Sequence, residues 1–158
     1  MSKIPASEPW FKDGLRFSCT QCGNCCTGGP GAVWYTPHEG REMAATLGIT
    51  EEEFTALYTR AIGERRSLNE RETPNGFDCV FLDRESRQGV ALCKIYKTRP
   101  SQCGTWPFWP DNLTSERAWK AAKARTPCPG MDTGPLIPSD QIGILRERDR
   151  VDNDSAPW

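Results

Sequence analysis

The chain has 158 residues and a formal net charge of −1, with 20 lysines and arginines against 21 aspartates and glutamates. This length suits one domain with a modest hydrophobic core. The balanced charge gives no electrostatic reason to expect a nucleic acid or an anionic membrane as a partner. Residues 1–19 lack the continuous apolar stretch of a secretory signal, and no run of about 18 apolar residues follows. We therefore expect a cytoplasmic location, where most thiols stay reduced.

Residues 36–48 and 50–61 carry the strongest helix signals in the chain. Each begins with a threonine that is followed three residues later by a glutamate, which is the pattern of a capping box. Pro37 suits the first position of a helix, and Gly48 is placed to end it. The apolar residues that recur at helical spacing are Met43, Ala44, Leu47, Phe54, Leu57, Tyr58 and Ala61. We predict one helix over each segment.

The pattern changes in the second half of the chain. Residues 77–83 are apolar-rich and partly alternating, residues 84–89 are polar and end in glycine, and residues 90–96 alternate again. This arrangement predicts a β-hairpin. Residues 98–110 contain three prolines and several aromatic residues, and we expect them to be irregular.

Helical spacing returns towards the C-terminus. We predict a helix that ends at Arg125, before Pro127, and a short helix over residues 139–148 with Ile142 and Leu145 on its apolar side. Residues 151–158 are expected to form a loose terminus.

The stretch "FSCTQCGNCC", residues 17–26, holds four of the eight cysteines. Cys19, Cys22 and Cys25 lie at intervals of three, which lets a tight loop direct its thiolates at one centre, as in zinc knuckles and ferredoxin loops. Adjacent side chains in extended backbone point to opposite faces. Cys26 is therefore expected to serve a second centre, to bridge within a cluster, or to be a buried passenger.

The other cysteines are Cys79, Cys93, Cys103 and Cys128, which are dispersed. Eight thiols fit two four-ligand sites, and they fit one cluster with spare thiols equally well. A disulfide framework competes with metal binding, but it is disfavoured in a reducing compartment. A thioredoxin-like redox pair also competes, but here three thiols stand in a glycine-rich loop instead of one pair opening a helix.

Three stretches together resemble the CxxCxxCC, or YkgJ-like, family, which is described as a zinc- or iron-chelating domain. They are residues 17–26, then "CKIYKTRPSQCGTWPFWP" from Cys93, then "PCPG" at residues 127–130. The resemblance extends from about Phe17 to Met131, and the chain departs from it at Gly104, where the family often has arginine. It implies that all eight cysteines bind metal, namely Cys19, Cys22, Cys25, Cys26, Cys79, Cys93, Cys103 and Cys128.

Several other residues close to the cysteines in sequence have alternative interpretations. Arg99 lies between Tyr96 and Cys103, where it offsets the negative charge of thiolates or pairs with a carboxylate. Four aromatic residues are either core filler or part of a dry shell around the metal, namely Trp34, Trp106, Phe108 and Trp109. His38, the only histidine, is interpreted as a surface polar residue.

These observations lead to a small, loop-rich α+β fold with a metal-stapled cysteine-rich core, one β-hairpin and three to four short helices. The expected organisation is an N-terminal arm over residues 1–16, a cysteine-cluster metal-binding domain over residues 17–131, and a C-terminal helix with a loose tail over residues 132–158. The expected cofactor is zinc or iron, including an iron–sulfur cluster, with a metal ion and an unknown protein as partners. The function hypotheses are a metal-binding protein with a redox or modification role, and a zinc-stapled interaction module without catalysis.

Overall fold

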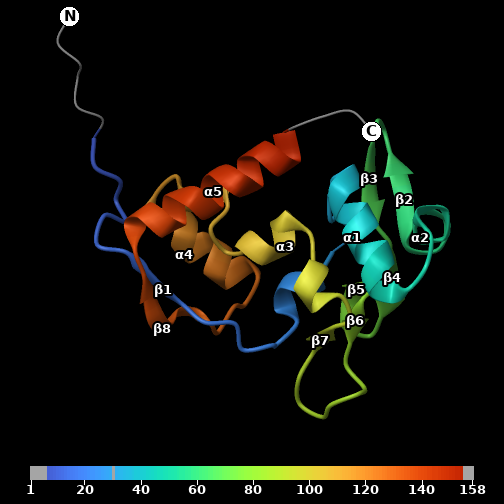
Figure 1. Cartoon of the computed structure of the whole chain (residues 1–158). Helices are drawn as coiled ribbons and strands as arrows, with labels where there is room; N and C mark the ends of the chain where they lie inside the picture. The colour runs from blue at the N-terminus through green and yellow to red at the C-terminus, as the bar shows by residue number, and fades with distance from the viewer. Residues whose placement is uncertain (1–6, 30, 155–158) are drawn as a thin grey trace, which may run out of the picture.

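The computed structural model describes residues 7–29 and 31–154, in which short helices and small hairpins alternate (Figure 1). The helices are α1 (Pro37–Leu47), α2 (Glu51–Tyr58), α3 (Ser101–Thr105), α4 (Glu116–Arg125) and α5 (Ser139–Asp154). The strands are β1 (Leu15–Phe17), β2 (Thr59–Ile62), β3 (Arg65–Leu68), β4 (Glu70–Thr73), β5 (Gly76–Cys79), β6 (Leu82–Asp83), β7 (Leu92–Cys93) and β8 (Met131–Ile137). Short 3-10 turns cover Asn24–Cys26, Tyr96–Thr98 and Pro110–Leu113.

The strands form four separate antiparallel pairs: β1 with β8, β2 with β3, β4 with β5, and β6 with β7. Together with the five helices, this confirms the α+β prediction in its coarse form. Within the described part of the chain, no helix has the length and apolar character needed to cross a membrane.

The two capped helices form because their caps are local. At the start of α1 the side chain of Thr36 accepts a hydrogen bond from the backbone N–H of Glu39, and the side chain of Glu39 accepts one from the backbone N–H of Thr36. Thr50 and Glu53 form the same pair of hydrogen bonds at the start of α2. The prediction was wrong beyond Tyr58, where α2 ends and β2 begins. Ala61 therefore lies in a strand, and Leu57 is 63 % exposed instead of buried.

The predicted hairpin over residues 77–96 is confirmed only in its centre, where β6 pairs with β7. The first part of the predicted strand instead forms β5, which pairs with the preceding β4 around Asn75 and Gly76. Asn-Gly is a strong hairpin signal, and Gly76 has a positive φ of 116°, a conformation that glycine adopts easily. This signal was present in the sequence and was missed.

The C-terminal helices are confirmed, with changed boundaries. The side chain of Ser115 caps α4, which ends at Arg125 as expected. The last helix continues through Asp154 instead of ending near residue 148, so the expected loose terminus is helical up to that residue. Its remaining residues, 155–158, lie outside the described part of the chain. The segment expected to be irregular contains the short helix α3.

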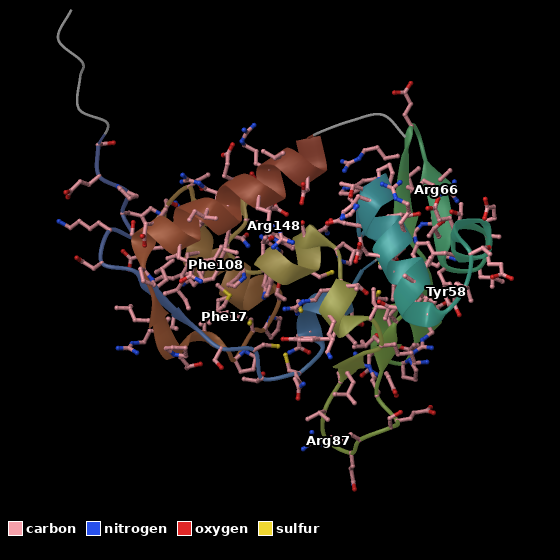
Figure 2. The ribbon with its side chains drawn as sticks, viewed as in Figure 1. Phe17, Tyr58, Arg66, Arg87, Phe108 and Arg148 are labelled. Carbon is pink, nitrogen blue, oxygen red and sulfur yellow. The ribbon has the colours of Figure 1, made fainter. Side chains whose placement is uncertain are left out.

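Two hydrophobic clusters form the core, one in each half of the molecule. The first gathers Phe11, Trp106, Phe108, Leu113, Trp119, Ala122, Cys128, Met131 and Ile142, under α4 and α5. The second gathers Tyr35, Met43, Ala44, Phe54, Leu68, Phe81 and Ile95, beside α1 and α2. Figure 2 shows Phe17 and Phe108 in the first half and Tyr58 in the second, with sulfur atoms in the middle of the molecule. One cavity lined by cysteines borders Trp106 of the first cluster and Leu68 and Ile95 of the second, so these cysteines lie where the two halves meet.

Candidate metal centre

Five of the eight cysteines line one small cavity of about 70 Å³ between the two halves. Cys25 and Cys26 come from the N-terminal loop, Cys79 from the end of β5, Cys93 from the end of β7, and Cys103 from α3. All eight cysteines are free thiols. The cavity therefore brings together thiols that are far apart in the sequence, with 78 residues between the positions of Cys25 and Cys103.

The adjacent cysteines do not point apart as extended backbone would require. Residues Asn24–Cys26 form a 3-10 turn, and the sulfurs of Cys25 and Cys26 lie 3.8 Å apart. The expectation that their side chains take opposite faces was therefore wrong. Two neighbouring sulfur ligands of a tetrahedral zinc ion, with Zn–S bonds of about 2.3 Å, are also roughly 3.8 Å apart. Both thiols line the cavity, so each is placed to serve as a metal ligand.

Backbone and side-chain hydrogen bonds hold the N-terminal loop against the other segments. The N–H of Ala91 donates to Gln21 O at 2.8 Å, and the N–H of Phe77 donates to Gly28 O at 2.8 Å. The side chain of Gln102 on α3 accepts the N–H of Trp34 and donates to Ala32 O, each at 3.0 Å. Sequence reasoning missed Gln102, because nothing near it in the chain indicates this long-range contact.

The pKa values of Cys25, Cys79, Cys93 and Cys103 are raised at the cavity. The hydrogen bond with Cys26, followed by burial, raises the pKa of Cys25. Burial raises the pKa of Cys79 to about 11 and raises those of Cys93 and Cys103. Without metal these four groups are therefore thiols at neutral pH, and a metal ion that binds them must displace their protons.

Two arginines place positive charge beside the cysteines. Arg99 lines the cavity and stacks on Tyr96, with 4.2 Å between the guanidinium carbon and the ring centroid. Its positive charge offsets part of the rise that burial and the neighbouring thiols cause in the pKa of Cys25, Cys93 and Cys103. Sequence reasoning missed Arg84, which lay in a stretch expected to be a polar turn. Its Nε lies 2.9 Å from Oδ2 of the buried Asp78, and it interacts electrostatically with Cys22 and Cys26.

Trp106 also borders the cavity, and its indole N–H is an orphaned donor. The side chain is 7 % exposed, and Nε1 has no hydrogen-bond partner among the described residues. A buried donor without an acceptor costs about 1–3 kcal/mol. A thiolate sulfur held at the cavity by a metal is an acceptor for such a donor, so this feature fits a metal–thiolate group.

The sulfurs are not drawn together into a closed coordination sphere. Among residues 7–29 and 31–154, no three His, Cys, Asp or Glu side chains converge closely enough to hold a metal ion. Cys19, Cys22 and Cys128 do not line the small cavity. His38 lies on the exposed face of α1, with Nε2 3.8 Å from Oε1 of Glu42. The thiols at the cavity are of the donor type that zinc and iron prefer. Metal binding requires their sulfurs to move closer to one another.

Comparison with known proteins assigns this arrangement of cysteines to a family. The sequence model of the CxxCxxCC family, described as a "putative zinc- or iron-chelating domain", matches residues 18–129. The chain belongs to the CxxCxxCC family. The matched range contains all eight cysteines and both arginines beside them.

One relative of this CxxCxxCC protein is an uncharacterized protein of Methanocaldococcus jannaschii, 30 % identical over 102 residues. The match covers 62 % of this chain and 48 % of the relative, so the chain spans about half the length of that protein. No solved structure matches significantly.

Because the indole N–H of Trp106 has no acceptor, we expect substitutions at two neighbouring tryptophans of the CxxCxxCC domain to affect different properties, metal affinity at one and stability at the other. Trp106→Phe removes a donor without an acceptor, whereas Trp109→Phe removes a hydrogen bond to Gln102 O at 2.8 Å. We expect Trp106→Phe to weaken zinc binding about tenfold, which corresponds to about 1.4 kcal/mol for a hydrogen bond to a charged sulfur. We expect the matched Trp109→Phe variant to lose more stability in its metal-free form.

Zinc competition with a chromophoric chelator and urea unfolding of the metal-free proteins measure these two effects. Equal zinc affinities for wild type and Trp106→Phe would show that the indole N–H does not reach a ligand sulfur.

Proposed function

We propose that this chain binds a zinc or iron ion through thiolates at the junction of its two halves. The ligands are Cys25, Cys79, Cys93 and Cys103, with Cys26 beside them. Four thiolates suit both zinc and iron, because these metals favour sulfur in tetrahedral surroundings. The family description supports chelation of one of these two metals.

The observation that carries the proposal is the single cavity shared by five thiols, an arginine and an orphaned indole N–H. Any one buried cysteine is an ordinary small hydrophobic residue. Five thiols from four separate segments around one cavity are not explained by packing alone. A nearby guanidinium favours the charged thiolate form that a metal requires.

Two roles follow for such a centre, and different observations favour each. The position between two separate hydrophobic clusters favours a structural staple, because closed four-thiolate zinc sites are structural. A second cavity of about 400 Å³ shares Cys25, Cys26 and Cys79 with the first, and this open access favours a redox or modification role at an iron or iron–sulfur centre. We propose the staple as the primary role, because it needs no substrate.

Metal analysis of the protein purified without oxygen tests the proposal. We expect zinc or iron in at least stoichiometric amount. A colourless protein with zinc supports the staple, whereas broad visible absorbance with iron and acid-labile sulfide supports the redox role. Finding no bound metal, with all eight thiols reacting freely with a thiol reagent, would refute metal binding.

A further inference from the structure

Three cysteines remain outside the small cavity, and two of them open the CxxCxxCC motif. Cys19 and Cys22 belong to the N-terminal loop, and Cys128 follows α4. The segment of residues 127–130 is fastened across this loop at both ends. The N–H of Ser18 donates to Gly130 O at 3.1 Å, and Nδ2 of Asn24 donates to Pro127 O at 2.6 Å. Cys128 therefore lies opposite the part of the loop that contains Cys19 and Cys22.

Two backbone N–H groups of the loop donate to the sulfurs of the first two cysteines. The sulfur of Cys19 accepts the N–H of Gln21 at 3.4 Å, and the sulfur of Cys22 accepts the N–H of Asn24 at 3.4 Å. Such N–H bonds stabilise the thiolate form that binds metal.

The same loop stores backbone strain at one residue. Gln21 has a positive φ of 57°, which is uncommon for a residue with a side chain. Backbone strain of this kind persists only where surrounding contacts enforce it, and it often marks a functional site. Here the positive φ turns the chain between Cys19 and Cys22.

Charge at this loop comes from an arginine different from the one at the cavity. Arg84 interacts with Cys22 and Cys26, whereas Arg99 interacts with Cys25, Cys93 and Cys103. Asp78, which is 1 % exposed, fixes Arg84 in this position. A zinc ion with four thiolates carries two net negative charges, and a separate arginine beside each group of thiols offsets part of that charge.

We propose that the chain holds a second metal centre, formed by Cys19, Cys22 and Cys128 with Cys26 as its fourth ligand. This inference rests on the proposed function, because it divides the eight thiols between two ions of the same chemical class. Cys25, Cys79, Cys93 and Cys103 form the inner centre, and Cys26 lies at the boundary, 3.8 Å from the sulfur of Cys25. The outer centre takes a divalent ion that favours four sulfur ligands, such as Zn²⁺ or Co²⁺. Because Cys19 is exposed, this ion exchanges faster than the inner one.

Cobalt titration of the reduced metal-free chain tests the second centre. We expect thiolate-to-cobalt charge-transfer absorbance to rise until two equivalents are bound, and one equivalent to be lost quickly to a chelator. Cys128→Ser and Cys103→Ser are reciprocal variants, and each is expected to bind one equivalent. Only the equivalent retained by Cys128→Ser should exchange slowly.

A separate variant covers the case in which Cys128→Ser fails to fold, since Cys128 belongs to a hydrophobic cluster. Cys19→Ser changes an exposed residue and must lower the stoichiometry from two to one in the same way. A wild-type stoichiometry of one that Cys19→Ser leaves unchanged and Cys103→Ser abolishes overturns the second centre and leaves the proposed function intact. A chain that binds no cobalt overturns both.

Discussion

Removal of the metal under reducing conditions is expected to lower the melting temperature by about 8–16 °C. A ligand present at a thousand times its dissociation constant stabilises the native state by about 4 kcal/mol. Each kcal/mol corresponds to about 2–4 °C for a domain of this size. The expected shift is this large because the proposed ligands come from distant segments, and a metal that joins them closes long loops in the folded chain.

The loss of stability should be uneven along the chain. Helices α1 and α2 have complete capping boxes and pack around Met43 and Phe54, both of which are almost fully buried. Residues 77–130 instead contain the two-residue strands β6 and β7 and the five-residue helix α3. Such short elements protect few amides by themselves. We therefore expect amide exchange to rise over residues 77–130 and to change little in α1.

Calorimetry and hydrogen exchange with and without a chelator measure this prediction. The Cys103→Ser variant is the control, because a chain that has lost its inner centre should show a smaller response to the same chelator. If the melting temperature stays unchanged after verified loss of metal, the two hydrophobic clusters are stable without it. The metal would then have a chemical role instead of a structural one.

The fold could be predicted from the sequence where local signals decide it. Capping boxes at Thr36 and Thr50 and the serine cap of α4 involve residues three apart, so the sequence contains the whole interaction. The pairs β2–β3 and β4–β5 were missed. Strands β3 and β4 are rich in arginine and glutamate, which are good helix formers. Their strand conformation depends on pairing between segments, which periodicity does not reveal.

The candidate site also has features that local sequence predicted and features that depend on long-range packing. The triplet spacing from Cys19 to Cys25 and the family resemblance pointed to metal, and family membership is confirmed. The grouping of Cys79, Cys93 and Cys103 around Cys25 depends on how the cysteine loop, the ends of β5 and β7, and α3 come together at the cavity. No local pattern encodes this arrangement. The same holds for Arg84, whose position depends on Asp78 six residues earlier and on the path of the cysteine loop.

A methyl group at Gly130 is expected to lower the free energy of unfolding by about 1–3 kcal/mol, the usual cost of overpacking. A Cβ at this residue would lie 2.0 Å from the carbonyl oxygen of Ser18, and a backbone atom cannot move aside cheaply. The segment that carries Cys128 must then separate from the cysteine loop, with loss of the Ser18–Gly130 hydrogen bond. Gly130→Ala should therefore also weaken binding of the faster-exchanging cobalt ion.

The matched control for this variant is Gly143→Ala in α5, where a Cβ would meet no atom within 4 Å. Alanine in a helix is favoured over glycine by about 0.5–1 kcal/mol, so this variant should be more stable than wild type. Urea unfolding of both variants measures the opposite changes expected in the free energy of unfolding. Cobalt titration of Gly130→Ala measures the expected loss of metal affinity. A Gly130→Ala protein as stable as wild type, with both cobalt ions bound normally, would mean that the two backbones do not meet at Ser18. Cys128 would then have no fixed position opposite Cys19 and Cys22, because the clamp at Gly130 is what sets the distance between the two segments.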